Sequence, residues 1–213
     1  MTFVFIHGLG QTCQAWERTL VQLNQYDSVQ TPDFLELLNG KPVTYTNLYE
    51  SCVLAWSQNQ KKIHLCGLSL GAILALNYAL DYPERIASLV LIAPQFKMPR
   101  ALMSVQNTIF RLLPQRAFKT MGFNKHDVLT LTQSMAPLDF SNRLTPFNFP
   151  SCVMCGSKDK ANKKSSYMLS SFTRHGYVEV DDSGHAVNED NPKLLAEKLT
   201  SFYNSFLSEE YLE

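Results

Sequence analysis

The chain has 213 residues, 45% of them hydrophobic, so it is long enough to bury one good core and predicts one domain. Its formal net charge is zero, which argues against a general electrostatic attraction to nucleic acid, and we expect no nucleic-acid partner. No stretch approaches the roughly 18 apolar residues of a membrane span. The five cysteines are an odd count without the disulfide framework of a small secreted domain, and they indicate a reducing cytoplasm.

Short apolar runs rich in Val, Ile and Leu alternate with helical patterns along the chain, which is typical of parallel strands buried on both faces. The predicted strands are residues 2–6, 28–31, 62–66, 86–92, 151–155 and 177–180. The predicted helices are residues 13–23, 46–59, 69–81 and 191–207. Right-handed crossovers would place the helices on both faces of a mostly parallel sheet of about six strands.

The alternation is interrupted between residues 94 and 146, where prolines punctuate helical patterns and no strand-like run occurs. Pro99 is placed to begin a helix and Pro114 to end it. We predict a helical lid over residues 94–146, inserted in a core formed by residues 1–93 and 147–213. The residues that we expect to face a substrate are Met98, Leu102, Met103 and Phe110.

The charge of this segment is unbalanced. Between residues 86 and 126 there is no Asp or Glu, and the basic residues are Lys97, Arg100, Arg111, Arg116, Lys119 and Lys125. One interpretation is a solvated basic face, balanced by acidic loops below it. The other is a cationic lid that attracts an anionic group of the substrate, such as a carboxylate or the phosphopantetheine of an acyl carrier.

The pattern Gly-x-Ser-x-Gly at residues 67–71 lies between a predicted strand and a predicted helix. On so sharp a turn the serine adopts a strained backbone conformation with its hydroxyl exposed at the edge of the sheet. The helix N-terminus also favours negative charge beside it. We therefore predict Ser69 as a nucleophile, against the alternative of a plain glycine-rich turn.

A nucleophilic serine needs a base, and the base needs an orienting group. His185 follows the last predicted strand and a glycine, so its ring can reach the same edge of the sheet. Asp159 follows the preceding strand and gives the chain order Ser, Asp, His. We predict His185 as the base and Asp159 as the acid. The alternatives are a loop histidine and a solvated aspartate without a role. Asp181, Asp182 and Asp190 are nearer to His185 in sequence, but the acid should approach from the loop of the neighbouring strand, and Asp182 is the second candidate.

With these motifs and with His7-Gly8-Leu9-Gly10 after the first strand, the chain resembles the α/β-hydrolase superfamily over nearly its whole length. The resemblance implies an α/β-hydrolase fold and an oxyanion hole formed by the backbone N–H groups of Leu9 and Leu70. It also implies that His7 supports this loop rather than catalyses. The chain departs from the family in lacking the usual N-terminal hairpin and in carrying the apolar residues 32–38 where a glycine-rich loop is usual.

A serine at residue 69 excludes the family branches that use an aspartate nucleophile and leaves acyl transfer, without metal or cofactor. The chain is similar to small cytoplasmic serine carboxylesterases, including those that act on acyl-chain esters in biotin synthesis. The expected partner is a small-molecule ester, neutral, anionic or carrier-bound. Two alternatives stay open: a lyase of the menaquinone-synthesis type and a ligand-binding receptor on the same fold. The Cys-x-x-C of Cys152 and Cys155 has no second pair, and we expect no metal there.

Overall fold

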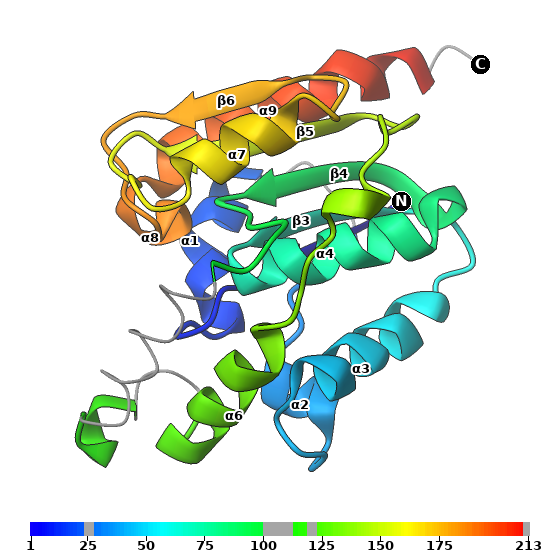
Figure 1. The fold of residues 1–213 in the computed structure, drawn as a ribbon. Coiled ribbons are helices and arrows are strands. Elements are labelled where there is room, and N and C mark those ends of the chain that lie inside the picture. The colour runs from blue at the N-terminus through cyan, green and yellow to red at the C-terminus, as the bar shows by residue number, and fades with distance from the viewer. Residues whose placement is uncertain (24–27, 100–112, 119–122, 211–213) are drawn as a thin grey trace.

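A sheet of six parallel strands forms the centre of the computed structural model, which describes residues 1–23, 28–99, 113–118 and 123–210 (Figure 1). The strands are β1 Thr2–Ile6, β2 Val29–Gln30, β3 Ile63–Leu68, β4 Ile86–Ile92, β5 Ser151–Gly156 and β6 Tyr177–Val180. Their order across the sheet is β2-β1-β3-β4-β5-β6. The predicted α/β fold with a mostly parallel sheet of about six strands is confirmed.

Helices cover both faces of this sheet. Those described are α1 Glu17–Leu20, α2 Phe34–Leu38, α3 Tyr45–Ser57, α4 Leu70–Asp81, α6 Lys125–Met135, α7 Lys163–Ser170, α8 Val187–Asp190 and α9 Pro192–Glu210. Short 3₁₀ turns lie at Cys13–Trp16, Val21–Leu23, Pro83–Arg85, Gln115–Phe118 and Ser141–Arg143. Within the described residues, no helix has the length and apolar content that crossing a membrane would require.

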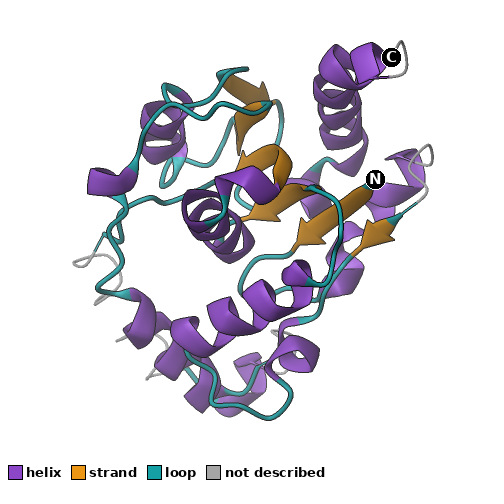
Figure 2. Cartoon of the chain, turned by 90° about the vertical axis from the view of Figure 1, so that its right-hand side faces the viewer, coloured by secondary structure: helices purple, strands orange, loops and turns teal. Residues whose placement is uncertain are grey.

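The core is divided by the sheet because successive strand side chains point to opposite faces. Val4 and Ile6 pack with the buried side chains of α2, α3, α4 and α6. Phe3 and Phe5 pack on the other face, where the 3₁₀ turns around α1 and the helices α8 and α9 supply the buried partners. Figure 2 shows the strands between these two layers of helices. The strands are therefore buried on both sides, as their continuous apolar runs predict.

Several elements differ from the sequence prediction. The predicted helix at residues 13–23 is a 3₁₀ turn, one turn of α-helix and a second 3₁₀ turn. Helix α4 begins at Leu70 instead of Ser69, because Ser69 has a positive φ. The apolar residues after Pro32 form the unpredicted helix α2, whose N-cap Asp33 accepts a hydrogen bond from the Leu35 N–H at 2.9 Å. Helix α7 was also unpredicted.

The segment between β4 and β5 is tied to the core at several points. Arg143 donates to Asn77 at 3.1 Å and to Asp81 at 2.5 Å on helix α4. Within the segment, the Phe140 N–H donates to the Phe96 carbonyl at 2.8 Å, which joins its two ends. Helix α6 contributes buried side chains to the same face as α3 and α4. The predicted helix between Pro99 and Pro114 lies outside the described residues.

Candidate active site

The carboxyl ends of the parallel strands meet at one edge of the sheet, and the residues that follow them define the candidate site. Gly8 follows β1, Ser69 follows β3, Asp159 follows β5 and His185 follows β6. Strand order places β1, β3, β4, β5 and β6 side by side. Loops at this edge are the usual ligand-binding position in open α/β sheets.

Ser69 occupies the sharp turn between β3 and α4, with φ 54° and ψ −111°. The turn brings backbones so close that a Cβ on Gly67 would lie 2.3 Å from the Gly71 carbonyl oxygen, and one on Gly71 would lie 2.2 Å from the Ile6 carbonyl oxygen. Side chains at both positions are therefore excluded. The Ser69 N–H donates to the Ile92 carbonyl at 2.9 Å, which holds the strained residue against β4.

A chain of hydrogen bonds connects the three predicted catalytic side chains. His185 Nε2 lies 2.9 Å from Ser69 Oγ, and His185 Nδ1 lies 2.8 Å from Asp159 Oδ2. Because a carboxylate only accepts, Nδ1 carries the proton and Nε2 is left free to accept from the serine hydroxyl. Asp182, the second candidate for the acid, is exposed and pairs with Lys158 at 3.2 Å.

The Asp159 carboxylate is almost fully buried, whereas the His185 side chain is 46% exposed. Burial alone would raise the pKa of Asp159, but hydrogen bonds from His185 and Asn162 outweigh it and hold this pKa below its usual range. The acid is therefore ionised at neutral pH and can stabilise a positive charge that forms on the imidazole.

The loop after β1 lies against the serine turn, since a Cβ on Gly8 would be 3.4 Å from the Ser69 Cβ. Gln11 shapes this loop: its side-chain oxygen accepts from the Gly8 N–H at 3.1 Å, and its amide donates to Asn188 Oδ1 at 3.0 Å. Leu9 lies within this loop, and Leu70 is the first residue of α4, where backbone N–H groups lack intrahelical acceptors. Both N–H groups remain predicted oxyanion donors.

His7 is buried behind the same loop. Its Nδ1 donates to the Gly8 carbonyl at 2.9 Å, and its ring packs on Phe34 with the centroids 3.9 Å apart. Burial lowers the pKa of His7 from its ordinary value. A neutral, packed ring of this kind is consistent with the supporting role predicted for His7. The contact with Phe34 also shows that helix α2, which was not predicted, lies beside this loop.

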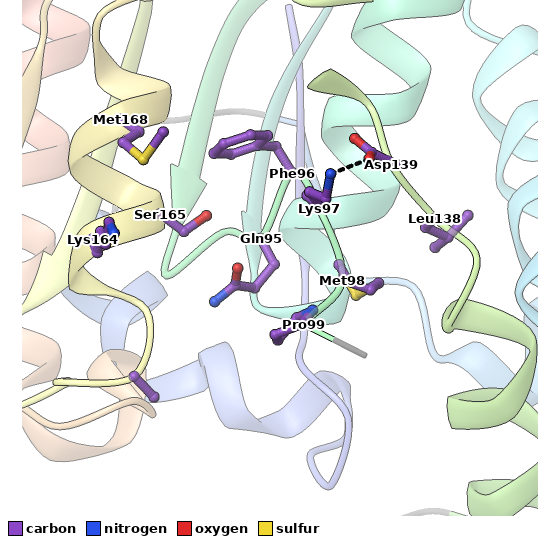
Figure 3. A pocket seen from close by; sticks show the side chains of 11 residues that line it. Gln95, Phe96, Lys97, Met98, Pro99, Leu138, Asp139, Lys164, Ser165 and Met168 are labelled. Atoms are coloured by element: carbon purple, nitrogen blue, oxygen red, sulfur yellow. Dashed lines mark ion pairs between the residues drawn. The ribbon is translucent and has the colours of Figure 1, made fainter. Parts of the chain in front are cut away.

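A cavity of about 610 Å³ lies between the loop after β4 and helix α7, and Ser69, Asp159 and His185 are not among its lining residues (Figure 3). Its lining residues are Gln95, Phe96, Lys97, Met98, Pro99, Leu138, Asp139, Ala161, Lys164, Ser165 and Met168. Of the four predicted substrate-contacting residues, Met98 lines this cavity, while Leu102, Met103 and Phe110 lie outside the described residues. The cavity is connected to the hydrogen-bond chain through Gln95, whose amide donates to Asn162 Oδ1 at 2.8 Å.

The basic residues of the predicted lid have different environments. Lys97 forms an ion pair with Asp139 at 2.8 Å, so part of the positive charge is neutralised at the cavity. Lys125 donates to the Leu113 carbonyl at 2.7 Å, and Arg116 is exposed. Arg100, Arg111 and Lys119 lie outside the described residues.

Sequence reasoning missed the polar residues that hold the site together, chiefly Asn162, Gln95, Gln11 and Asn188. An asparagine directly before a polar helical run is an N-cap signal, which could have located the start of α7. Nothing in the sequence indicates that its amide would turn toward Asp159. The contact between Gln95 and Asn162 joins residues that are 67 positions apart.

The strand order and a strained serine between β3 and α4 are the features of an alpha/beta hydrolase. A family model described as "Alpha/beta hydrolase family" matches residues 3–198, and the chain belongs to this family. A pimeloyl-[acyl-carrier protein] methyl ester esterase of Aliivibrio fischeri is 23% identical over 94% of this chain and 93% of its own length. The abhydrolase domain-containing protein abhd-5.2 of Caenorhabditis elegans is 28% identical, but this chain spans only 34% of it.

Solved structures with similar folds include MenH from S. aureus, with a TM-score of 0.78, 13% identity and coverage of 96% of this chain and 94% of that one. A thermophilic esterase from Thermogutta terrifontis has a TM-score of 0.76 and 17% identity, covering 96% of this chain and 90% of that one. At these identities the likeness concerns the fold. The match to the family model supports a hydrolase.

Proposed function

We propose that the protein is a serine hydrolase that cleaves a carboxylic ester or thioester through an acyl-enzyme on Ser69. The observation that carries this proposal is the unbroken chain from Ser69 Oγ through the His185 ring to Asp159, with distances of 2.9 and 2.8 Å. Both contacts have the lengths of real hydrogen bonds, on a serine that is held in a strained conformation.

In this mechanism Ser69 Oγ attacks the carbonyl carbon of the substrate while His185 Nε2 takes the hydroxyl proton. The oxyanion that forms would be bound by the backbone N–H groups of Leu9 and Leu70, a type of interaction worth about 2.7–4 kcal/mol per donor. His185 then protonates the leaving alcohol or thiol. Water enters, His185 removes its proton, and a second tetrahedral intermediate releases the acid.

The cavity supports an acyl-chain substrate. Phe96, Met98 and Met168 give it apolar walls, and Lys164 gives it a positive charge, while Lys97 is paired with Asp139. An acyl chain with an anionic end, free or carried on an acyl carrier, combines these two features. The relative from Aliivibrio fischeri, named as an esterase of a carrier-bound methyl ester, supports this class of substrate. The five cysteines are free thiols, which supports a location in the cytoplasm.

The test is covalent labelling with a fluorophosphonate, together with hydrolysis of p-nitrophenyl acetate and of natural esters. We expect the wild-type protein to be labelled and to turn over repeatedly, and Ser69→Ala to lose both properties. Equal hydrolysis by the alanine variant would contradict the proposal. A single slow turnover would favour a receptor, and labelling without ester turnover would favour a lyase.

A further inference from the structure

Asn162 stands at the N-cap of helix α7 but does not cap it. Asparagine is among the preferred N-cap residues because its side-chain oxygen can accept from the first N–H groups of the helix. In this structure the side chain makes no such bond, and its backbone has φ −105° and ψ −13° instead of an extended conformation. The capping contacts at the start of this helix come from Asp159 instead: its Oδ1 accepts from the Asn162 N–H at 3.2 Å, and its carbonyl accepts from the Lys163 N–H at 3.1 Å.

The amide of Asn162 is turned toward the acid instead. Its Nδ2 lies 3.0 Å from Asp159 Oδ1 and 2.9 Å from Oδ2, and its backbone N–H donates to Oδ1 at 3.2 Å. The same Nδ2 lies 3.0 Å from His185 Nδ1. Since the histidine uses only Oδ2, Asn162 occupies the lone pairs that remain, and the carboxylate cannot rotate without breaking these bonds.

Gln95 fixes the orientation of this amide. Its Nε2 donates to Asn162 Oδ1 at 2.8 Å, so the oxygen of Asn162 faces Gln95 and its nitrogen faces the carboxylate. Gln95 comes from the loop after β4 and lines the cavity together with Ser165 and Lys164 of α7 (Figure 3). A continuous series of contacts thus leads from the cavity wall through Asn162 and Asp159 to the base.

We propose that Asn162, oriented by Gln95, is a positioning residue that holds the Asp159 carboxylate against His185 and moderates its charge. The proposal rests on the proposed hydrolase function, since it concerns the same acid and base. A carboxylate that accepts fewer hydrogen bonds keeps more of its negative charge for its remaining partner. Removing the amide therefore favours the protonated imidazole, which is inactive as a base.

The elements around the ring carry several charged groups, and among the described residues Asp159 is the charged side chain hydrogen-bonded to Asn162. On the loop after β5 and in α7 the others are Lys158, paired with Asp182, Lys163, paired with Glu179, and Lys160 and Lys164. On the histidine loop and in α8 they are Asp182, paired with Lys158, Asp190, bonded to the Gly184 N–H, and Glu189, bonded to Gln11.

The test compares Asn162→Leu, which keeps the shape of the side chain without its hydrogen bonds, with Gln95→Leu, the double variant and the control Ser165→Ala. Ser165 lines the same cavity, and its hydroxyl has no hydrogen-bond partner among the described residues. We expect Asn162→Leu to lower kcat by up to about 100-fold with little change in KM. The acidic limb of its kcat/KM profile should move up by about one pH unit, the equivalent of one hydrogen bond to a charged group.

Gln95→Leu should shift the limb in the same direction by less, and it should add nothing in the Asn162→Leu background, because it acts through Asn162. Ser165→Ala should leave the limb in place. Asn162→Ser, a second substitution that removes the amide but keeps a small polar side chain, should give the same shift with little change in Tm, which separates positioning from a role in folding.

The titration midpoint of the His185 ring, followed by NMR, gives a second readout that does not require turnover. We expect it to rise in both Asn162 variants. Unchanged midpoints and unchanged limbs would overturn the proposal, as would full additivity of Gln95→Leu and Asn162→Leu. A Ser69→Ala variant with wild-type activity would instead refute the hydrolase function, while the NMR midpoints would still decide the role of Asn162.

Discussion

Replacing Asp159 with asparagine tests the acid assignment most directly, because the structure leaves no acceptable place for an amide nitrogen. Oδ2 accepts from His185 and from Asn162, while Oδ1 accepts from the side chain and the backbone of Asn162. Whichever oxygen becomes nitrogen, a donor then faces at least two donors. If the nitrogen takes the Oδ2 position, the imidazole must accept through Nδ1 and carry its proton on Nε2.

An imidazole protonated on Nε2 cannot take the proton of Ser69. In the serine-protease template this change of tautomer lowers kcat by about 10⁴, which corresponds to about 5 kcal/mol of barrier. We expect a loss of that order for Asp159→Asn, with KM changed much less. The buried donor contacts should also lower the free energy of unfolding by about 1–3 kcal/mol.

The assay is steady-state hydrolysis of an activated ester, with urea unfolding of the same samples to confirm that they are folded. Asp182→Asn is the matched control, since Asp182 is exposed and has φ 56°, a conformation that asparagine tolerates. We expect this control to keep its activity and its stability within about 0.5 kcal/mol. A near-wild-type Asp159→Asn together with an inactive Asp182→Asn would place the acid on the histidine loop and refute our assignment.

Three further predictions concern the core, the pH dependence and the cavity. Gly71→Ala should lower the free energy of unfolding by more than about 3 kcal/mol, because the added Cβ would overlap the backbone of β1. Gly40→Ala has open space for the Cβ but a φ of +81°, and chemical unfolding should show a loss of about 1–2 kcal/mol. Burial lowers the pKa of His64 to about 4, so the unfolded state binds a proton at a higher pH than the folded state does. The free energy of unfolding should therefore fall by up to about 3 kcal/mol between pH 6.5 and pH 4. In His64→Gln, chemical unfolding should show most of this pH dependence removed. For the cavity, kcat/KM of an anionic or carrier-bound ester should fall as salt rises while that of a neutral ester barely changes, and Lys164→Glu should lower only the former; equal salt responses would contradict an anionic substrate.

The strands could be predicted from the sequence because they are buried on both faces and therefore read as short apolar runs. The prediction for β4 matches the structure at both ends, and β3 begins one residue later than predicted and runs two residues further, to Leu68 before the serine turn. Helix α7 could not be predicted in the same way, since its apolar residues are Tyr167, Met168 and Leu169, and the first two are exposed. Helix α2 has five residues, too few for a periodic pattern.

The three side chains of the candidate site could be predicted from the sequence because each lies within a few residues of the end of a strand at one sheet edge. Their catalytic roles stay predictions, although the structure brings them within hydrogen-bonding distance. The residues that hold them were not foreseen. Gln95 reaches Asn162 only because β4 and β5 are neighbours, and a contact of this kind has no local sequence signal.

Most residues with a strained backbone in the described chain lie at the sheet edge that carries the candidate site. Of the four non-glycine residues with positive φ, Asn39 ends helix α2, while Ser69, Ala93 and Asp182 follow β3, β4 and β6. Such conformations cost on the order of 1–3 kcal/mol each and persist only where surrounding bonds enforce them. Two of them are enforced by contacts beyond the strand ends, from the Ser69 N–H to Ile92 at 2.9 Å and from the Ala93 N–H to Met154 at 2.8 Å. Three of the four departures from local backbone preference therefore lie where the proposed chemistry lies, which is where selection for function rather than for stability would place them.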